Sequence, residues 1–281
     1  MSKIALVTDS TADIPLEMAK NYNINIIPLK VVFGEREYLD GVELQPDEFY
    51  QMLEKSEALP SSSQPAPADF IRLYQDLLER YSEVISIHLS SGLSGTVNAA
   101  RLAGNKFKGK IHVVDSKSIS LGIGLIVVEA AKSIRAGLKT HEILKRVQEV
   151  RNNSEVLFTL DTLEYLRKGG RIGKVSGLVG SMLHIKPVVR VNEDGIYVPF
   201  GKTRTQEQAL RAIERGFAAL ARGREAVRLV VAHGSAYEAA VRLKERLESL
   251  FNIEAEMFTK VGPVIGVHTG PGTVGAAVVY K

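Results

Sequence analysis

The sequence predicts an α/β fold in two domains: an N-terminal α/β domain with a parallel sheet, and a C-terminal α+β domain with a mixed sheet. In the first half, short apolar strand segments alternate with helical segments, and each strand segment ends in polar residues. That order is typical of a parallel sheet with helices on both faces. In the second half, strand segments outnumber helical ones and include a hairpin, which indicates a mixed sheet. The change falls near residues 152–155, so we predict domains over residues 1–153 and 154–281.

The elements of the first half are predicted from the spacing of apolar residues. Continuous runs of apolar residues indicate strands, and apolar residues that recur every three or four positions indicate helices. Asp13 is expected to cap a short first helix that has Pro15 in its first turn. Three prolines and three central serines predict a loop over residues 59–67. The other predicted elements are strands at 4–7, 24–28, 84–89 and 111–116, a hairpin over 30–39, and helices over about 45–53, 70–78, 97–103, 122–136 and 140–152.

The elements of the second half are predicted in the same way. Asp161 and Glu164 form a capping-box pattern for a short helix. His233 and His268 are each expected at the end of a strand, next to glycine. The other predicted elements are a glycine-rich helical stretch over 175–183, strands at 156–160, 186–192, 196–200, 228–232, 253–258 and 274–280, and helices over about 206–221 and 237–250.

The composition excludes several classes of protein. Hydrophobic residues make up 45% and charged residues 24% of the 281 positions, as in ordinary globular proteins. A net charge of +4 allows an anionic ligand but is too weak to indicate nucleic acid. The absence of cysteine excludes disulfides and thiolate chemistry. No apolar run is long enough to span a bilayer, and the first residues lead directly into a strand, so we expect neither a signal peptide nor membrane insertion. The cytoplasm is then the default location, and we expect a monomer.

The turn over residues 89–96 is the strongest candidate site. It joins a predicted buried strand to a helix and carries Ser91, Ser94, Gly95 and Thr96. The first N–H groups of a helix are unpaired and lie at its positive end, so they favour small anions. Serine and threonine are also ordinary N-cap and turn residues, which leaves a purely structural role open. Polar residues at 9–11 and 115–116 end neighbouring predicted strands at the same edge, where ligands of parallel sheets bind, and this favours a site.

The remaining motifs point to binding more than to catalysis. The six histidines lack metal-ligand spacing, so no metal is expected. His268 is the best functional candidate among them, because glycines on both sides allow close approach of the backbone. A helix C-terminus explains the basic and glycine-rich residues 167–170, whereas Arg171 and Lys174 are free to meet a phosphate or an acidic partner. Walker, Rossmann and G-x-S-x-G motifs are missing, although an esterase or phosphatase with Ser94 as nucleophile stays open.

Several motifs together resemble the DegV family. They run in family order along nearly the whole chain, at residues 8–15, 62–65, 89–96, 166–172 and 268–272. The resemblance implies a two-domain fatty-acid-binding protein that needs no cofactor and is not an enzyme. The acyl chain would lie in an apolar tunnel, and the carboxylate would be held between the domains by hydroxyl groups.

The resemblance also implies roles for individual residues. Ser94 and a hydroxyl of Ser62 or Ser63 would hold the carboxylate, with His268 nearby. Ser91, Gly95 and Thr96 of the serine turn are also expected to bind the carboxylate. Arg171 and Arg204 would serve a partner fatty acid kinase or the acyl phosphate that it forms for phospholipid synthesis. The family usually has threonine in place of Ser62, so we expect altered packing with the hydroxyl retained. A lipid-sensing adaptor is an alternative to the carrier.

Overall fold

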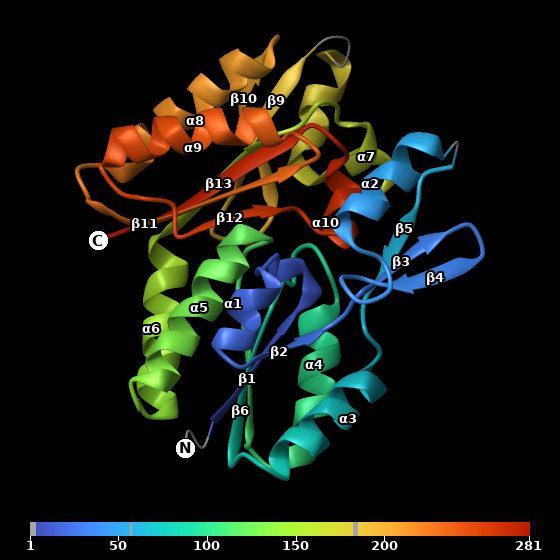
Figure 1. Ribbon diagram of the computed structural model, residues 1–281, viewed down its shortest axis with the longest axis vertical. Coiled ribbons are helices and arrows are strands. Elements are labelled where there is room, and N and C mark those ends of the chain that lie inside the picture. Colours follow the sequence, from blue (N-terminus) through green and yellow to red (C-terminus); the bar gives the residue numbers. More distant parts are fainter. Residues whose placement is uncertain (1–3, 57, 182–184) are drawn as a thin grey trace.

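The computed structural model describes residues 4–56, 58–181 and 185–281 and contains the two predicted sheets (Figure 1). The N-terminal part holds a parallel sheet in the order β2-β1-β6-β7, and the C-terminal part holds a mixed sheet in the order β10-β9-β8-β13-β11-β12. The predicted fold class is therefore confirmed. The division into domains at residues 153 and 154 stays a prediction.

Helices cover both faces of the parallel sheet, which consists of β1 (Ile4–Asp9), β2 (Ile24–Ile27), β6 (Glu83–His88) and β7 (Ile111–Asp115). Successive side chains of β6 point to opposite faces. Val84 packs with α3 (Pro67–Leu78) and α4 (Thr96–Gly104), whereas Ile85 and Ile87 belong to the core that includes α5 (Leu121–Arg135). Helix α6 (Thr140–Asn153) packs against α5, and the short helices α1 (Leu16–Asn21), η1 (Ser10–Ala12) and η2 (Asn105–Phe107) complete this part.

A small third sheet corrects one prediction. Strands β3 (Lys30–Phe33) and β4 (Arg36–Leu39) form the expected hairpin, and α2 (Pro46–Lys55) follows. Residues 59–67 were predicted as a loop, but Ser61–Ser63 form the edge strand β5, with Ser62 opposite Val31 of β3. The flanking prolines restrict this strand to three residues, because proline cannot donate to the ladder.

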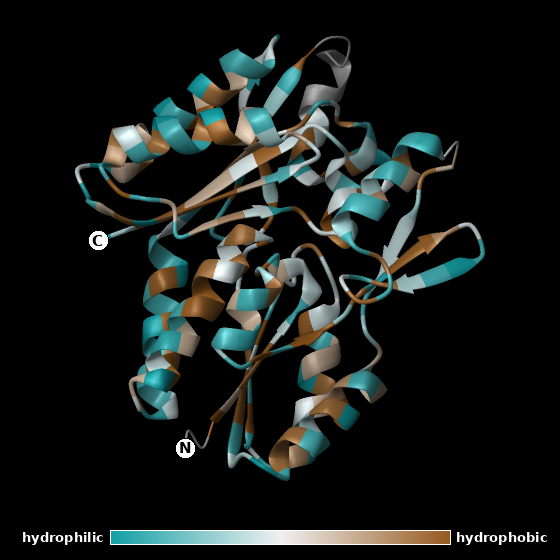
Figure 2. Ribbon diagram, in the orientation of Figure 1, coloured by the Kyte–Doolittle hydropathy of each residue, from teal (hydrophilic) through white to brown (hydrophobic). Residues whose placement is uncertain are grey.

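The mixed sheet packs α8 (Gln206–Ala221) and α9 (Tyr237–Phe251) on one face and the N-terminal part on the other. Successive side chains of β8 (Ser154–Thr159) point to these two faces in turn. Leu157 belongs to the core with α8 and α9, whereas Val156 and Phe158 belong to the core with α5. Figure 2 shows both hydrophilic and hydrophobic residues along α8 and α9, as expected for helices with one face on the sheet. The strands are β8 (Ser154–Thr159), β9 (Lys186–Val191), β10 (Tyr197–Thr203), β11 (Ala226–Gly234), β12 (Met257–Lys260) and β13 (Thr273–Tyr280).

Three local predictions in this part need correction. His268 was expected at the end of a strand, but it lies in helix α10 (Pro263–Thr269). Asp161 does not cap α7 (Glu164–Lys168); the Thr162 hydroxyl accepts from Glu164 N, and Asp161 pairs with Lys186 at 2.6 Å. The predicted helical stretch over 175–183 is a 3-10 helix, η3 (Gly173–Ser181), and its last two positions lie outside the described residues.

Asp13 is also not an N-cap. Its carboxyl group accepts hydrogen bonds from the Ser120 hydroxyl and from Gly262 N, so it joins the N-terminal part to the residue before α10. Helix α1 begins after Pro15, which makes no side-chain capping bond. Within the described ranges, none of the helices combines the length and apolar character that a bilayer crossing requires.

Candidate functional site

A small cavity of about 50 Å³ brings together residues that lie far apart in the sequence. Ser62, Ser63, Ser94, Arg171 and His268 all line it. They come from β5, the serine turn, the segment after α7, and helix α10 (Figure 1). The other lining residues are Leu29, Gln64, Leu89, Leu93, Tyr197, Val264 and Ile265, so the polar groups face a largely apolar wall.

Ser62 and His268 form a direct hydrogen bond, with 2.8 Å between Oγ and Nε2. Burial, together with the nearby Arg171 charge, lowers the pKa of His268 to about 4. The imidazole is therefore neutral at neutral pH. When Nε2 carries the proton, it donates a hydrogen bond to Ser62 Oγ, and the Ser62 hydroxyl is then free to donate its own hydrogen bond to a ligand.

Close packing fixes the ring of His268. Its Nδ1 is buried without a hydrogen-bond partner among the described residues. A methyl group on Gly169 would lie 2.3 Å from Nδ1, so a glycine is needed at that position for the ring to stay where it is. A Ser-His-acid triad requires a third group that orients the base, and the described residues supply none at Nδ1.

The serine turn orients Ser94 toward the cavity. Ser94 Oγ lies 2.9 Å from Thr96 Oγ1 and accepts from Thr96 N at 3.3 Å. Gly95 is the residue before α4, and a methyl group there would lie 2.2 Å from Gln64 Oε1. Gly95 and Thr96 do not line the cavity, but they contact two residues that do, Gln64 and Ser94. Among the described residues, no histidine forms a hydrogen bond with Ser94 of the kind that activates a serine nucleophile.

Ser91 and Arg204 were predicted as site residues, but neither lines the cavity. The Ser91 hydroxyl donates to Asp115 Oδ2 at 2.5 Å, and its backbone N–H donates to Asp115 Oδ1 at 3.3 Å. Ser91 thus joins the ends of β6 and β7. Arg204 is exposed between β10 and α8, where its N–H donates to Gln208 Oε1 at 3.1 Å.

Arg171 brings positive charge to the cavity. Its Nε donates to Leu93 O at 3.4 Å and its Nη1 to Gly169 O at 2.8 Å. Both acceptors are neutral carbonyls, so neither contact neutralises the guanidinium. The charge favours an anionic group in the same cavity.

An apolar cavity of about 30 Å³ lies next to the first one and shares Ile265 with it. This cavity lies between the two parts of the chain. Ile119 and Leu121, at the start of α5, line it from the N-terminal part, and Val156 and Phe158 of β8 line it from the C-terminal part. The first cavity therefore carries the polar groups, and the second is lined mostly by apolar side chains. Gln64 and Tyr197 were not among the predicted site residues; Gln64 belongs to the serine-proline segment, whereas no pattern in the sequence distinguishes Tyr197 from other strand residues.

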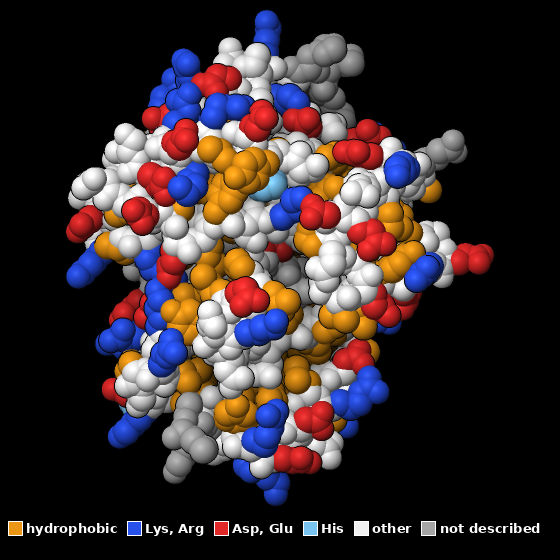
Figure 3. Space-filling view, in the orientation of Figure 1, with side chains coloured by type: hydrophobic (Ala, Val, Ile, Leu, Met, Phe, Trp, Pro, Cys, Tyr) orange, Lys and Arg blue, Asp and Glu red, His pale blue; other side chains and the backbone are white. Residues whose placement is uncertain are grey.

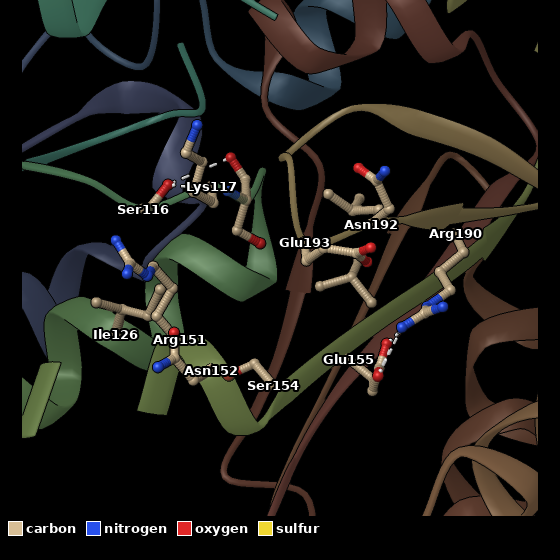
Figure 4. Close-up of a pocket in the computed structure, with 13 residues that line it drawn as sticks. Ser116, Lys117, Ile126, Arg151, Asn152, Ser154, Glu155, Arg190, Asn192 and Glu193 are labelled. Carbon is tan, nitrogen blue, oxygen red and sulfur yellow. Dashed lines mark hydrogen bonds and ion pairs between the residues drawn. The ribbon is translucent and has the colours of Figure 1, made fainter. Parts of the chain in front are cut away.

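A larger cavity of about 330 Å³ lies between the end of β7, the C-terminus of α6 and the β9–β10 hairpin (Figure 4). Two of the charged groups that line it pair with each other. Arg190 forms a bidentate pair with Glu155, with both N–O distances 2.8 Å, and Arg151 donates to Asp115 O at 3.2 Å. None of the predicted site residues lines this cavity.

A family model described as "Uncharacterised protein, DegV family" matches residues 3–281. The chain belongs to the DegV family. A DegV domain-containing protein from Clostridium acetobutylicum is 38% identical over 285 residues, which covers all of both chains. The resemblance found in the sequence motifs is thus confirmed.

Solved structures of DegV proteins share the fold. A structure from Thermus thermophilus, described as fatty acid binding of a DegV family protein, has a TM-score of 0.92 and 35% identity over 99% of each chain. A structure from Bacillus subtilis, described as DegV, a fatty acid binding protein, has a TM-score of 0.88 and 35% identity over all of both chains. Fatty acid binding is therefore a property of DegV proteins related to this chain.

Proposed function

We propose that the chain binds a long-chain fatty acid, with its carboxylate in the cavity lined by Ser62, Ser94 and His268. The observation that carries the proposal is the convergence of two serine hydroxyls, a neutral histidine and an arginine beside an apolar wall. Relatives described as fatty acid binding proteins support the same conclusion.

The polar end suits a carboxylate. A carboxylate accepts hydrogen bonds and carries one negative charge, so it needs donors and a nearby cation. The hydroxyls of Ser62 and Ser94 supply donors, Ser63 lines the same cavity, and Arg171 supplies the charge. His268 acts through Ser62, because a proton on Nε2 directs the Ser62 hydroxyl toward the ligand.

The apolar end suits an acyl chain. Burial of each methylene contributes about 0.8 kcal/mol, so a long chain binds tightly if it leaves water along most of its length. Cavities of about 50 and 30 Å³ hold only a few waters, and a long chain needs more room than that. We therefore propose that the walls around Ile265 and Phe158 move apart when the ligand enters between the predicted domains.

The proposed role is that of a carrier. The protein would present the bound carboxylate to a partner fatty acid kinase, and the resulting acyl phosphate would enter phospholipid synthesis. Arg171, which lines the cavity, and Arg204, which is exposed, are the proposed contacts for the kinase or the acyl phosphate.

A calorimetric titration of delipidated protein tests the carboxylate site. Palmitate and methyl palmitate have the same acyl chain, but only palmitate carries a charge. We expect palmitate to bind at least tenfold more tightly than the ester. Equal affinities would contradict a site built for a carboxylate, and binding of neither would contradict the function.

A further inference from the structure

We propose that the chain has a second ligand site, for a small zwitterion that carries a carboxylate and an ammonium group several carbons apart. The site is the cavity of about 330 Å³ between the end of β7, the C-terminus of α6 and the β9–β10 hairpin, here called the hairpin cavity (Figure 4). Its volume is within the range of small-molecule pockets. None of its lining residues lines the cavity that holds Ser62 and Ser94, so this inference goes beyond the proposed function.

The hairpin cavity lies where a ligand of a parallel sheet is expected. Residues 116–118 line it directly after β7 ends, and ligands of such sheets bind beyond the carboxyl ends of the strands. The opposite wall comes from the C-terminal part and includes Asn192 and Glu193, in the turn after β9. A molecule bound in the cavity would therefore contact both parts of the chain.

Close packing holds the two walls in place at the tip of the hairpin. A methyl group on Gly195 would overlap Ser90 Oγ and lie 2.9 Å from Lys117 Cα, so the turn after β9 packs directly against the segment after β7. Asp115 fixes the N-terminal wall. Its Oδ1 accepts from Lys117 N at 3.0 Å, and its carbonyl oxygen accepts from Arg151 Nη1 at 3.2 Å. The cavity is therefore pre-formed, as small-molecule sites usually are.

Two of the three basic side chains that line the hairpin cavity have acidic partners. Arg190 and Glu155 neutralise each other through their bidentate pair. Lys117 Nζ lies 3.5 Å from the Asp115 carboxylate. These pairs leave one lining cation and one lining anion to account for.

Arg151 and Glu193 are that cation and that anion. Arg151 Nη1 donates to a neutral carbonyl, and the guanidinium has no acidic partner in the described ranges. Glu193 is exposed and forms no ion pair with another described residue. Figure 4 shows the two residues on opposite sides of the cavity. Water would satisfy either charge alone, but their placement on two walls of one cavity suits a ligand with an anionic and a cationic end.

Ligands of other classes fit the same charges less well. A phosphate would meet Arg151 and Lys117 but would also face the carboxylates of Glu155 and Glu193. A metal ion is disfavoured, because the described residues hold no cluster of three or more His, Asp or Glu side chains. Figure 3 shows basic and acidic side chains interspersed over one face of the molecule, so no field of a single sign on that face attracts a charged ligand.

Apolar side chains supply the part of the wall that an aliphatic chain needs. Ile126, Val156 and Val191 are buried and all line the hairpin cavity. A chain of a few carbons would cover these side chains while its carboxylate contacts Arg151 and its ammonium group contacts Glu193. Burial of the carbons adds to the affinity that the two charged contacts provide.

Isothermal titration calorimetry with 6-aminohexanoate, hexanoate and hexylammonium chloride tests the proposal. All three have a six-carbon chain, but only 6-aminohexanoate carries both charges. The protein is first saturated with palmitate, so that hexanoate does not enter the proposed fatty acid site. A protein that takes up no palmitate has no such site to block, so failure of the proposed function leaves this test intact. We expect 6-aminohexanoate to bind at least tenfold more tightly than either of the other compounds.

Two variants each remove one of the charges. Glu193→Gln should reduce the affinity for 6-aminohexanoate to within threefold of that for hexanoate, and Arg151→Gln to within threefold of that for hexylammonium. The matched controls are Glu35→Gln, in the exposed turn between β3 and β4, and Arg101→Gln, at an exposed position on α4. Each control should change the affinity less than twofold.

Three results would overturn the proposal. The first is equal affinity for 6-aminohexanoate and either singly charged compound, and the second is no binding of any of the three. The third is undiminished 6-aminohexanoate binding in Glu193→Gln. This variant lies in an exposed turn and should fold even if Arg151→Gln, which loses the bond to Asp115, does not.

Discussion

Ser62 and His268 lie 206 residues apart in the sequence and share a hydrogen bond of 2.8 Å at the cavity that Ser94 and Arg171 also line. The pair connects β5 of the N-terminal part to α10 of the C-terminal part. A ligand bound there contacts both parts of the chain at once. The predictions below follow from this arrangement.

Ser94→Ala should weaken fatty acid binding. A hydrogen bond to a charged group contributes about 1.5–3 kcal/mol, which corresponds to a dissociation constant raised about 10- to 150-fold. Ser91→Ala is the matched control, because the Ser91 hydroxyl contacts Asp115 outside the cavity. Palmitate titrations of both variants measure the effect. Equal losses of palmitate affinity in Ser94→Ala and Ser91→Ala would contradict a direct contact between Ser94 and the carboxylate.

Gly169→Ala should weaken binding through His268. The added methyl group would lie 2.3 Å from Nδ1, so the ring must move and its bond to Ser62 must lengthen or break. Gly177→Ala is the control, since no atom lies within 4 Å of a methyl group there. We expect at least a fivefold loss of palmitate affinity for the first variant and less than a twofold change for the second. Unchanged affinity in Gly169→Ala would show that the histidine position is unimportant.

Arg171→Ala should affect the partner kinase more than ligand binding. The serine hydroxyls remain in this variant, so we expect palmitate affinity to fall less than tenfold. Phosphorylation of the bound fatty acid should fall by a larger factor at saturating ligand. The assay requires the cognate kinase and a measurement of acyl phosphate. Complete loss of palmitate binding would contradict the proposed separation of roles.

His268 should make the folded state less stable at acidic pH. Its pKa is about 4 in the folded protein and near 6.5 in an unfolded chain, so the unfolded state binds more protons between these values. The free energy of unfolding should therefore fall as the pH drops from 6.5 to 4, by about 3 kcal/mol from this residue. Urea unfolding of the wild type and of His268→Gln measures the difference. If both lose stability equally over this range, His268 is not held neutral by its surroundings.

The sequence predicted the elements that depend on local pattern. Apolar runs and helical spacing gave the parallel sheet, the mixed sheet and the serine turn that begins α4, because each of these is encoded by neighbouring residues. Helix α8 was predicted with the bounds Gln206–Ala221 that the structure has. The hairpin of β3 and β4 was likewise predicted from two short segments on either side of Gly34.

Features that depend on distant partners were not predicted correctly. All seven residues of α10 are buried, and a short apolar run does not distinguish a buried helix from a strand, so His268 was assigned to a strand. Asp13 fits the local rule for a helix cap, but its partners are Ser120 and Gly262. Ser61–Ser63 form a strand only because β3 lies beside them.

Mass spectrometry of the purified protein tests the central claim most directly. The intact protein would be measured under native conditions and again after extraction with organic solvent, and the extract would be analysed for fatty acids. We predict a mass excess that disappears on extraction and is accounted for by one or two fatty acids. A protein that carries no such mass and takes up no added fatty acid would contradict the account.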